Sequence, residues 1–234
     1  MLNLIRAICL LILFSGIAVA AERKDPRAID SVALTTETQR MSNDSATLDL
    51  VWWVPVEFWE AAFRQDPSLP SYEADNMLEA MRPYFLMIVI QTDITPYGEF
   101  NFLPLSRIEG GLQVSYVDDR GNRSALPVLP STNREFEEML TVLRPLLANA
   151  MGNMGQNFHF FAFSAEDKNG NRIASPYEAG TISVSLNSRR DAAPIVFEFE
   201  APLDSLFVPR MCPNGKPAHI SWNFCPWDGS RLPR

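Results

Sequence analysis

The sequence has few of the residues from which enzyme active sites are usually built. Only two histidines and three cysteines occur in 234 residues. No serine lies in a Gly-x-Ser-x-Gly turn, and the chain contains no His-Glu-x-x-His, P-loop or Gly-x-Gly-x-x-Gly motif. The short motifs that identify serine hydrolases, zinc peptidases and nucleotide-binding enzymes are therefore missing. The sequence points to no cofactor and to no particular reaction.

Basic charge is also scarce. Lys and Arg together number 20 against 28 Asp and Glu, the net charge is −8, and no cluster of basic residues offsets it. Binding to nucleic acid or to anionic lipid needs a basic surface. The composition therefore disfavours both as partners, and we expect an unidentified protein or envelope component instead.

Long hydrophobic runs are absent except near the start. Arg6 precedes an apolar stretch, residues 7–14, and Ala18-Val19-Ala20 follows with small side chains. This order is typical of a cleavable signal peptide, here residues 1–20, because the apolar stretch is too short to span a bilayer. A retained anchor is the alternative. We expect an exported protein, periplasmic or secreted, that begins at Ala21 and has no transmembrane segment after cleavage.

The rest of the chain divides into three parts. Residues 21–45 are polar, charged and without sustained periodicity, which predicts a mobile N-terminal arm. Residues 46–208 show successive strand and helix patterns and predict one globular domain. Residues 209–234 form a short tail that contains both cysteines left after cleavage.

Hydrophobic periodicity predicts the elements of the domain. The run 85–92 is apolar on both faces and predicts a central strand. The last helix is expected to begin at a Thr132-x-x-Glu135 capping box and to kink or restart at Pro145. The expected fold is α+β, a mainly antiparallel sheet of six to eight strands packed by two or three helices. We expect strands at 48–54, 85–92, 99–103, 112–117, 158–163, 181–186 and 195–200, and helices at 55–63, 71–81 and 132–150.

Two turns share one pattern, since Asp118-x-x-Gly121-Asn122 recurs as Asp167-x-x-Gly170-Asn171. An old duplication and the reuse of common turn chemistry both account for the repeat. The second is favoured, because another repeated pattern in the chain, 77–83 and 139–145, recurs at a different spacing. The residues after Asp167 also imitate a calcium loop, but Arg172 replaces the required glycine, which favours a hairpin turn.

The tail is the most distinctive segment. It contains Cys212-Pro213-Asn214-Gly215 and Phe224-Cys225-Pro226-Trp227-Asp228-Gly229. These runs resemble the two Cys-Pro-x-Cys-Gly knuckles of a zinc ribbon. The first knuckle has lost one cysteine and Asp228 replaces another. Because two of four thiolates are missing, the Cys₄ site of such modules cannot form.

Three arrangements are open to the cysteines of the tail. A disulfide between Cys212 and Cys225 is favoured, because an even number of cysteines in an exported chain favours pairing. A zinc site remodelled from Cys212, His219, Cys225 and Asp228 is disfavoured, because this spacing fits no standard pattern. Free, buried thiols are the third arrangement. We expect no metal.

A wider resemblance includes residues outside the tail. The runs 202–210 (PLDSLFVPR) and 154–161 (MGQNFHFF) are similar to an uncharacterised family of exported bacterial proteins that end in a degenerate zinc-ribbon-like tail. The similarity extends over most of the chain after the signal peptide. The resemblance implies export and no activity.

Aromatic residues suggest a binding function. Exposed tryptophans stack on sugar rings and on apolar partners, and Trp222 and Trp227 lie in the tail. Trp52 and Trp59 fall on faces expected to be buried. Trp53 points opposite to Trp52 along its strand, so it is the candidate binding residue of the domain.

The leading hypothesis is an exported, non-enzymatic binding or interaction module of unknown ligand. The alternative is an exported hydrolase with scattered catalytic carboxylates, for which Glu57, Glu60 and Asp93 are available. His159 shares a strand face with aromatic residues and is expected to be packed rather than catalytic. A pocket with convergent carboxylates near His159 would favour the enzyme, and an aromatic patch around Trp53 the binding module.

Overall fold

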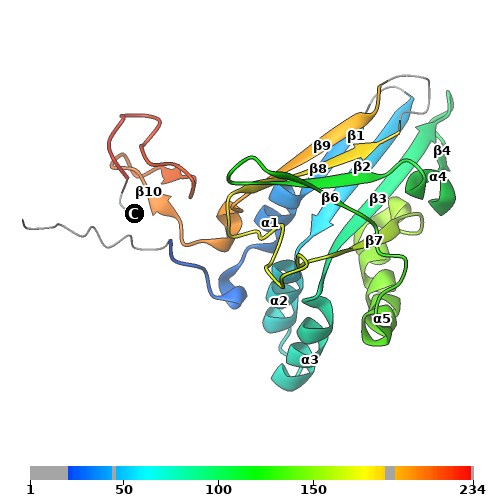
Figure 1. Ribbon diagram of the computed structural model, residues 1–234, viewed down its shortest axis with the longest axis horizontal. Helices are drawn as coiled ribbons and strands as arrows, with labels where there is room; N and C mark the ends of the chain where they lie inside the picture. Colours follow the sequence, from blue (N-terminus) through cyan, green and yellow to red (C-terminus); the bar gives the residue numbers. More distant parts are fainter. Residues whose placement is uncertain (1–20, 44–45, 188–192, 233–234) are drawn as a thin grey trace, which may run out of the picture.

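The computed structural model describes residues 21–43, 46–187 and 193–232. The expected signal peptide, residues 1–20, lies outside the described residues. Two antiparallel sheets and a group of helices form three layers (Figure 1). The α+β fold is confirmed, although the strands between residues 39 and 201 divide between two sheets instead of forming one. None of the described helices is long and apolar enough to cross a bilayer.

The middle sheet is built around β3 (Tyr84–Ile94). One edge of β3 pairs with β2 (Thr47–Val54), which pairs in turn with β1 (Gln39–Asn43). The other edge pairs with β7 (His159–Ser164) and, further along, with β4 (Phe100–Phe102). The outer sheet has the order β6 (Arg123–Leu126), β5 (Gln113–Asp118), β8 (Gly180–Leu186) and β9 (Ile195–Ala201).

Helices cover the face of the middle sheet opposite to the outer sheet (Figure 1). This layer consists of α2 (Val56–Gln65), α3 (Ser71–Met81) and α5 (Arg134–Ala150). The remaining helical segments are α1 (Ser31–Thr38), α4 (Leu105–Glu109) and the 3₁₀ turns η1 (Pro26–Ala28), η2 (Gly152–Met154) and η3 (Asp204–Leu206).

β3 faces two hydrophobic cores at once. Alternate residues such as Met87 and Val89 point into the core between the sheets, where they join Trp53 of β2 and Phe199 of β9. The residues between them, among them Ile88, point into the core under the helices. No side chain from Phe85 to Ile90 is more than 5% exposed. The expectation that this run forms a central strand is therefore confirmed.

The helices bury the stripes that their spacing predicts. Trp59 of α2, Leu78 of α3 and Leu143 of α5 are all buried against the middle sheet. Burial of such apolar area stabilises the fold by about 25 cal/mol for each Å² removed from water.

Helix α5 differs from the expectation in two details. Asn133 is its N-cap instead of Thr132, since the Asn133 side chain accepts a hydrogen bond from the backbone N–H of Phe136 at 2.8 Å. The helix also continues through Pro145 without a break. Pro145 lies on the exposed side of the helix.

The expectation of a mobile arm over residues 21–45 is wrong for the described residues 21–43. They form η1, α1 and β1, and β1 pairs with β2 along its whole length. Leu34 of α1 is fully buried and belongs to the core between the sheets. Thr38 accepts a hydrogen bond from the indole N–H of Trp52 at 3.1 Å. The segment shows little amphipathic pattern because tertiary contacts bury only a few scattered positions.

A pair of substitutions in α1 tests whether this segment is part of the folded domain. Leu34→Ala should lower the free energy of unfolding by about 3 kcal/mol, as expected when a fully buried leucine is truncated. Val32→Ala, at a position that is 76% exposed, is the matched control and should change it by less than about 0.5 kcal/mol. Urea unfolding followed by circular dichroism measures both. If both substitutions lowered the free energy of unfolding equally, α1 would not be packed against the domain.

Candidate functional site

The tail folds as a hairpin followed by a second turn of similar form. β10 (Arg210–Met211) pairs with β11 (Pro217–Ala218). The N–H of Gly215 donates to the carbonyl of Cys212, and the N–H of Gly229 donates to the carbonyl of Cys225, both at 2.9 Å. The two glycines have φ values of 79° and 71°, which only glycine adopts readily. Each turn thereby directs one cysteine into a small core of Cys212, Ala218, Cys225 and Leu232.

The tail is fixed to the domain at its base. Ile220 is buried in the core between the sheets, and its N–H donates to a carboxylate oxygen of Asp204 at 2.8 Å. The segment leading into the tail also pairs with the first described residues, since the N–H of Val208 donates to the carbonyl of Glu22 at 2.8 Å. The tail therefore leaves the domain beside the start of the described chain, as Figure 1 shows.

The two cysteines lie together as free, buried thiols. Burial, hydrogen-bond contact with Cys225 and the nearby charge of Asp228 raise the pKa of Cys212 to about 11. The raised pKa favours the thiol of Cys212 over its thiolate at neutral pH. Contact between the side chains is a requirement for a Cys212–Cys225 disulfide, and that disulfide stays a prediction.

The alternative zinc site is not assembled. The described part of the chain contains no group of three or more His, Cys, Asp or Glu side chains placed to hold a metal ion. Nδ1 of His219 is hydrogen-bonded to the hydroxyl of Ser221 at 2.8 Å. The Asp228 carboxylate accepts hydrogen bonds from the hydroxyl and N–H of Ser230, which lower its pKa. In this structure Cys212, His219, Cys225 and Asp228 are not gathered into one ligand set, and a zinc site there stays an alternative prediction.

Aromatic side chains remain exposed on the tail. Trp222 is 40% exposed, Trp227 48% and Phe224 59%, whereas the three tryptophans of the domain are at most 5% exposed. The rings of Trp222 and Trp227 contact each other edge to face, with centroids 6.2 Å apart. The Lys216 ammonium lies 5.1 Å from the centroid of Trp227. We call these four residues and His219, whose ring lies 6.0 Å from that of Trp222, the tail surface.

Trp53, the binding residue expected in the domain, is instead buried. Only 1% of it is exposed, and its ring contacts Phe199 of the outer sheet with centroids 6.4 Å apart. The alternation that placed Trp53 opposite to Trp52 is correct, but both faces of β2 are covered. The tail, where Trp222 and Trp227 lie, therefore replaces Trp53 as the aromatic candidate site.

The carboxylates of the hydrolase alternative do not converge near His159. Glu57 lies at the start of α2, is buried, and forms an ion pair with Arg172 at 2.9 Å. Asp93 lies towards the other end of the middle sheet, opposite Thr47 at the start of β2. Nε2 of His159 lies 3.4 Å from the carbonyl of Leu103, and burial lowers the pKa of its ring.

The repeated turns line a hollow of about 520 Å³ together with Arg172 and Glu178. Asp118 accepts hydrogen bonds from the N–H and side-chain amide of Asn122, both at 2.8 Å. Asp167 accepts the same two bonds from Asn171, at 2.9 and 3.0 Å. Both carboxylates are therefore used to close their own turns, as common turn chemistry predicts.

Comparisons with known proteins add no candidate. No family model matches this chain, and neither a curated protein nor a solved structure is significantly similar to it.

The buried carboxyl of Glu57 gives a prediction about pH. Burial raises its pKa above the ordinary value of 4.5, against the opposing effect of Arg172. The folded state then binds this proton more tightly than the unfolded state, so the contribution of Glu57 to stability falls as the pH rises from 4.5 through the folded-state pKa. Wild type should therefore lose stability relative to Glu57→Gln between pH 4.5 and 7.

Thermal unfolding at a series of pH values measures this difference. Glu79→Gln is the control, because it removes an exposed carboxylate of α3 that does not contribute to the pKa shift of Glu57. If the stability of wild type and of Glu57→Gln changes equally with pH, or if wild type gains stability relative to the variant as the pH rises, burial does not dominate the pKa of Glu57.

The contact between the cysteines gives a prediction about mass. Oxidised glutathione, which takes up two electrons and two protons, should convert the thiols to a disulfide and lower the intact mass of residues 21–234 by about 2 Da. The bond should raise the free energy of unfolding by about 3 kcal/mol, as expected for so short a loop. Cys225→Ala should show neither change. An unchanged mass together with bound zinc would instead support a metal site.

Proposed function

We propose that the protein is an exported, non-enzymatic binding module that contacts a component of the cell envelope through the tail surface. The observation that carries the proposal is the exposure of Trp222 and Trp227 in contact with each other, since the other three tryptophans are buried. Paired aromatic rings with one face in water are typical of contact surfaces, because their burial by a partner releases a large apolar area.

The way in which the tail is held supports this function. Arg210 donates hydrogen bonds to the carbonyls of Ile220 and Trp222, at 3.0 and 2.8 Å, and so fixes the segment that carries Trp222. Ile220 is anchored in the main core. A surface that is rigid before binding loses less conformational entropy when it binds.

The polar groups of the domain support a structural role for the domain rather than a catalytic one. Glu57 is paired with Arg172, and the buried Asp49 accepts a hydrogen bond from Gln91 at 2.8 Å. These bonds link α2 to the loop that contains Arg172, and β2 to β3. No specific observation among the described residues favours the hydrolase alternative.

Co-sedimentation of residues 21–234 with the isolated cell envelope of the producing organism tests the proposal. Wild type should bind, and the double variant Trp222→Ala/Trp227→Ala should bind at least about tenfold more weakly, since aromatic residues at the centre of an interface each contribute more than about 1 kcal/mol.

The control variant is Tyr72→Ala/Tyr97→Ala, which removes two aromatic rings that are 65% and 92% exposed on the domain. It should bind as wild type does. Unchanged thermal unfolding of both variants shows that the fold is intact. Equal loss of binding in both variants, or no loss in the tryptophan variant, contradicts a contact through the tail.

A further inference from the structure

The tail differs in charge from the rest of the protein. Residues 209–232 contain three basic side chains, Arg210, Lys216 and Arg231, and one acidic side chain, Asp228. The complete chain has a net charge of −8. The acidic composition that disfavours anionic partners therefore belongs to the domain, and the tail is locally basic. An anionic surface would attract the tail and repel the domain, which fixes the orientation of binding.

Basic and aromatic groups are interleaved on the tail. Lys216 lies over the ring of Trp227, and Phe224 forms a backbone bridge with Arg231. Apolar exposure continues towards the base of the tail at Met211, which is 49% exposed. Tryptophan is the side chain enriched where acyl chains meet headgroups, and lysine and arginine next to it reach the phosphates.

The base of the tail lies beside the first described residues. Backbone bonds join Val208 to Glu22, and Leu206 to Lys24, at the base of the tail. Figure 1 shows the first described residues and the segment before β10 side by side.

We propose that the tail surface binds anionic phospholipid as a peripheral contact. Trp222, Phe224 and Trp227 lie at the level of the headgroups, and Lys216 and Arg231 contact the phosphates. The inference rests on the function proposed above and names the envelope component as the lipid itself. Attraction of a basic side chain to anionic lipid falls off within a Debye length, so the binding weakens with salt.

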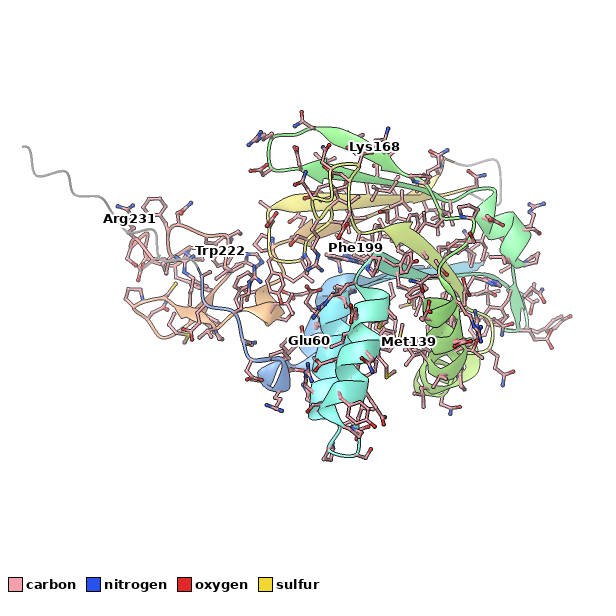
Figure 2. The ribbon with its side chains drawn as sticks, turned by 60° about the horizontal axis from the view of Figure 1, so that its bottom comes forward. Glu60, Met139, Lys168, Phe199, Trp222 and Arg231 are labelled. Atoms are coloured by element: carbon pink, nitrogen blue, oxygen red, sulfur yellow. The ribbon has the colours of Figure 1, made fainter. Side chains whose placement is uncertain are left out.

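Vesicle co-sedimentation of residues 21–234 tests the inference. Mixed vesicles of phosphatidylcholine and phosphatidylglycerol should bind the protein, and vesicles of phosphatidylcholine alone should bind it at least about tenfold more weakly. Lys216→Glu should weaken binding to the mixed vesicles by about tenfold or more, because it replaces an attraction with a repulsion. Lys168→Glu makes the same change of charge on an exposed turn of the domain, far from the tail in Figure 2, and should bind as wild type does.

Tryptophan fluorescence gives a second readout that does not depend on the lysine variants. Because Trp222 and Trp227 are exposed and the other three tryptophans are buried, mixed vesicles should shift the emission to shorter wavelength. The shift should be lost in Trp222→Ala/Trp227→Ala.

The outcomes separate the two proposals. Binding to isolated envelopes without binding to either vesicle would overturn the lipid inference and leave a protein or polysaccharide as the partner. Equal effects of Lys216→Glu and Lys168→Glu would overturn the tail as the lipid contact. Binding to neither envelopes nor vesicles would overturn both proposals.

Discussion

The constraint on which the rest of the structure depends is that β3 is apolar on both faces. A strand of this kind is stable only when each face is covered, because its side chains alternate between the two sides of the sheet. The outer sheet covers one side, where Met87 and Val89 lie, and helices α2, α3 and α5 cover the other, where Ile88 lies. The three layers follow from this one strand.

Because β3 is covered on both sides, neither of its faces is open to a ligand. The buried carboxylates of Glu57 and Asp49 are paired with Arg172 and with Gln91, as buried polar groups must be. The tail, in contrast, is poorly covered. It is too short to build a large core, and its own core of four residues leaves Trp222 and Trp227 outside. The exposed tryptophans therefore lie in the tail, where few other residues are available to cover them.

The tail forms two turns, each of which follows one of its two cysteines. Gly215 and Gly229 retain the positive φ that each turn requires. Ile220 and Asp204 connect the tail to the main domain. Its orientation thus depends on the fold of the domain and on the N-terminal segment that pairs beside it. A metal is not needed to explain why the tail has a fixed position.

The sequence by itself determined the local elements, because the periodicity of side chains records which residues share a face. The strands around Trp52 and Ile88, the stripes of α2 and α3, and the turns at Asp118 and Asp167 were all predictable in this way. The tail could be recognised as a separate segment with two exposed-aromatic candidates. Only the tertiary structure decided that the strands form two sheets, that Leu34 docks, and that Trp53 is buried while Trp222 is not. Alternation tells which side of a strand a residue takes, but coverage of that side depends on segments far away in the chain.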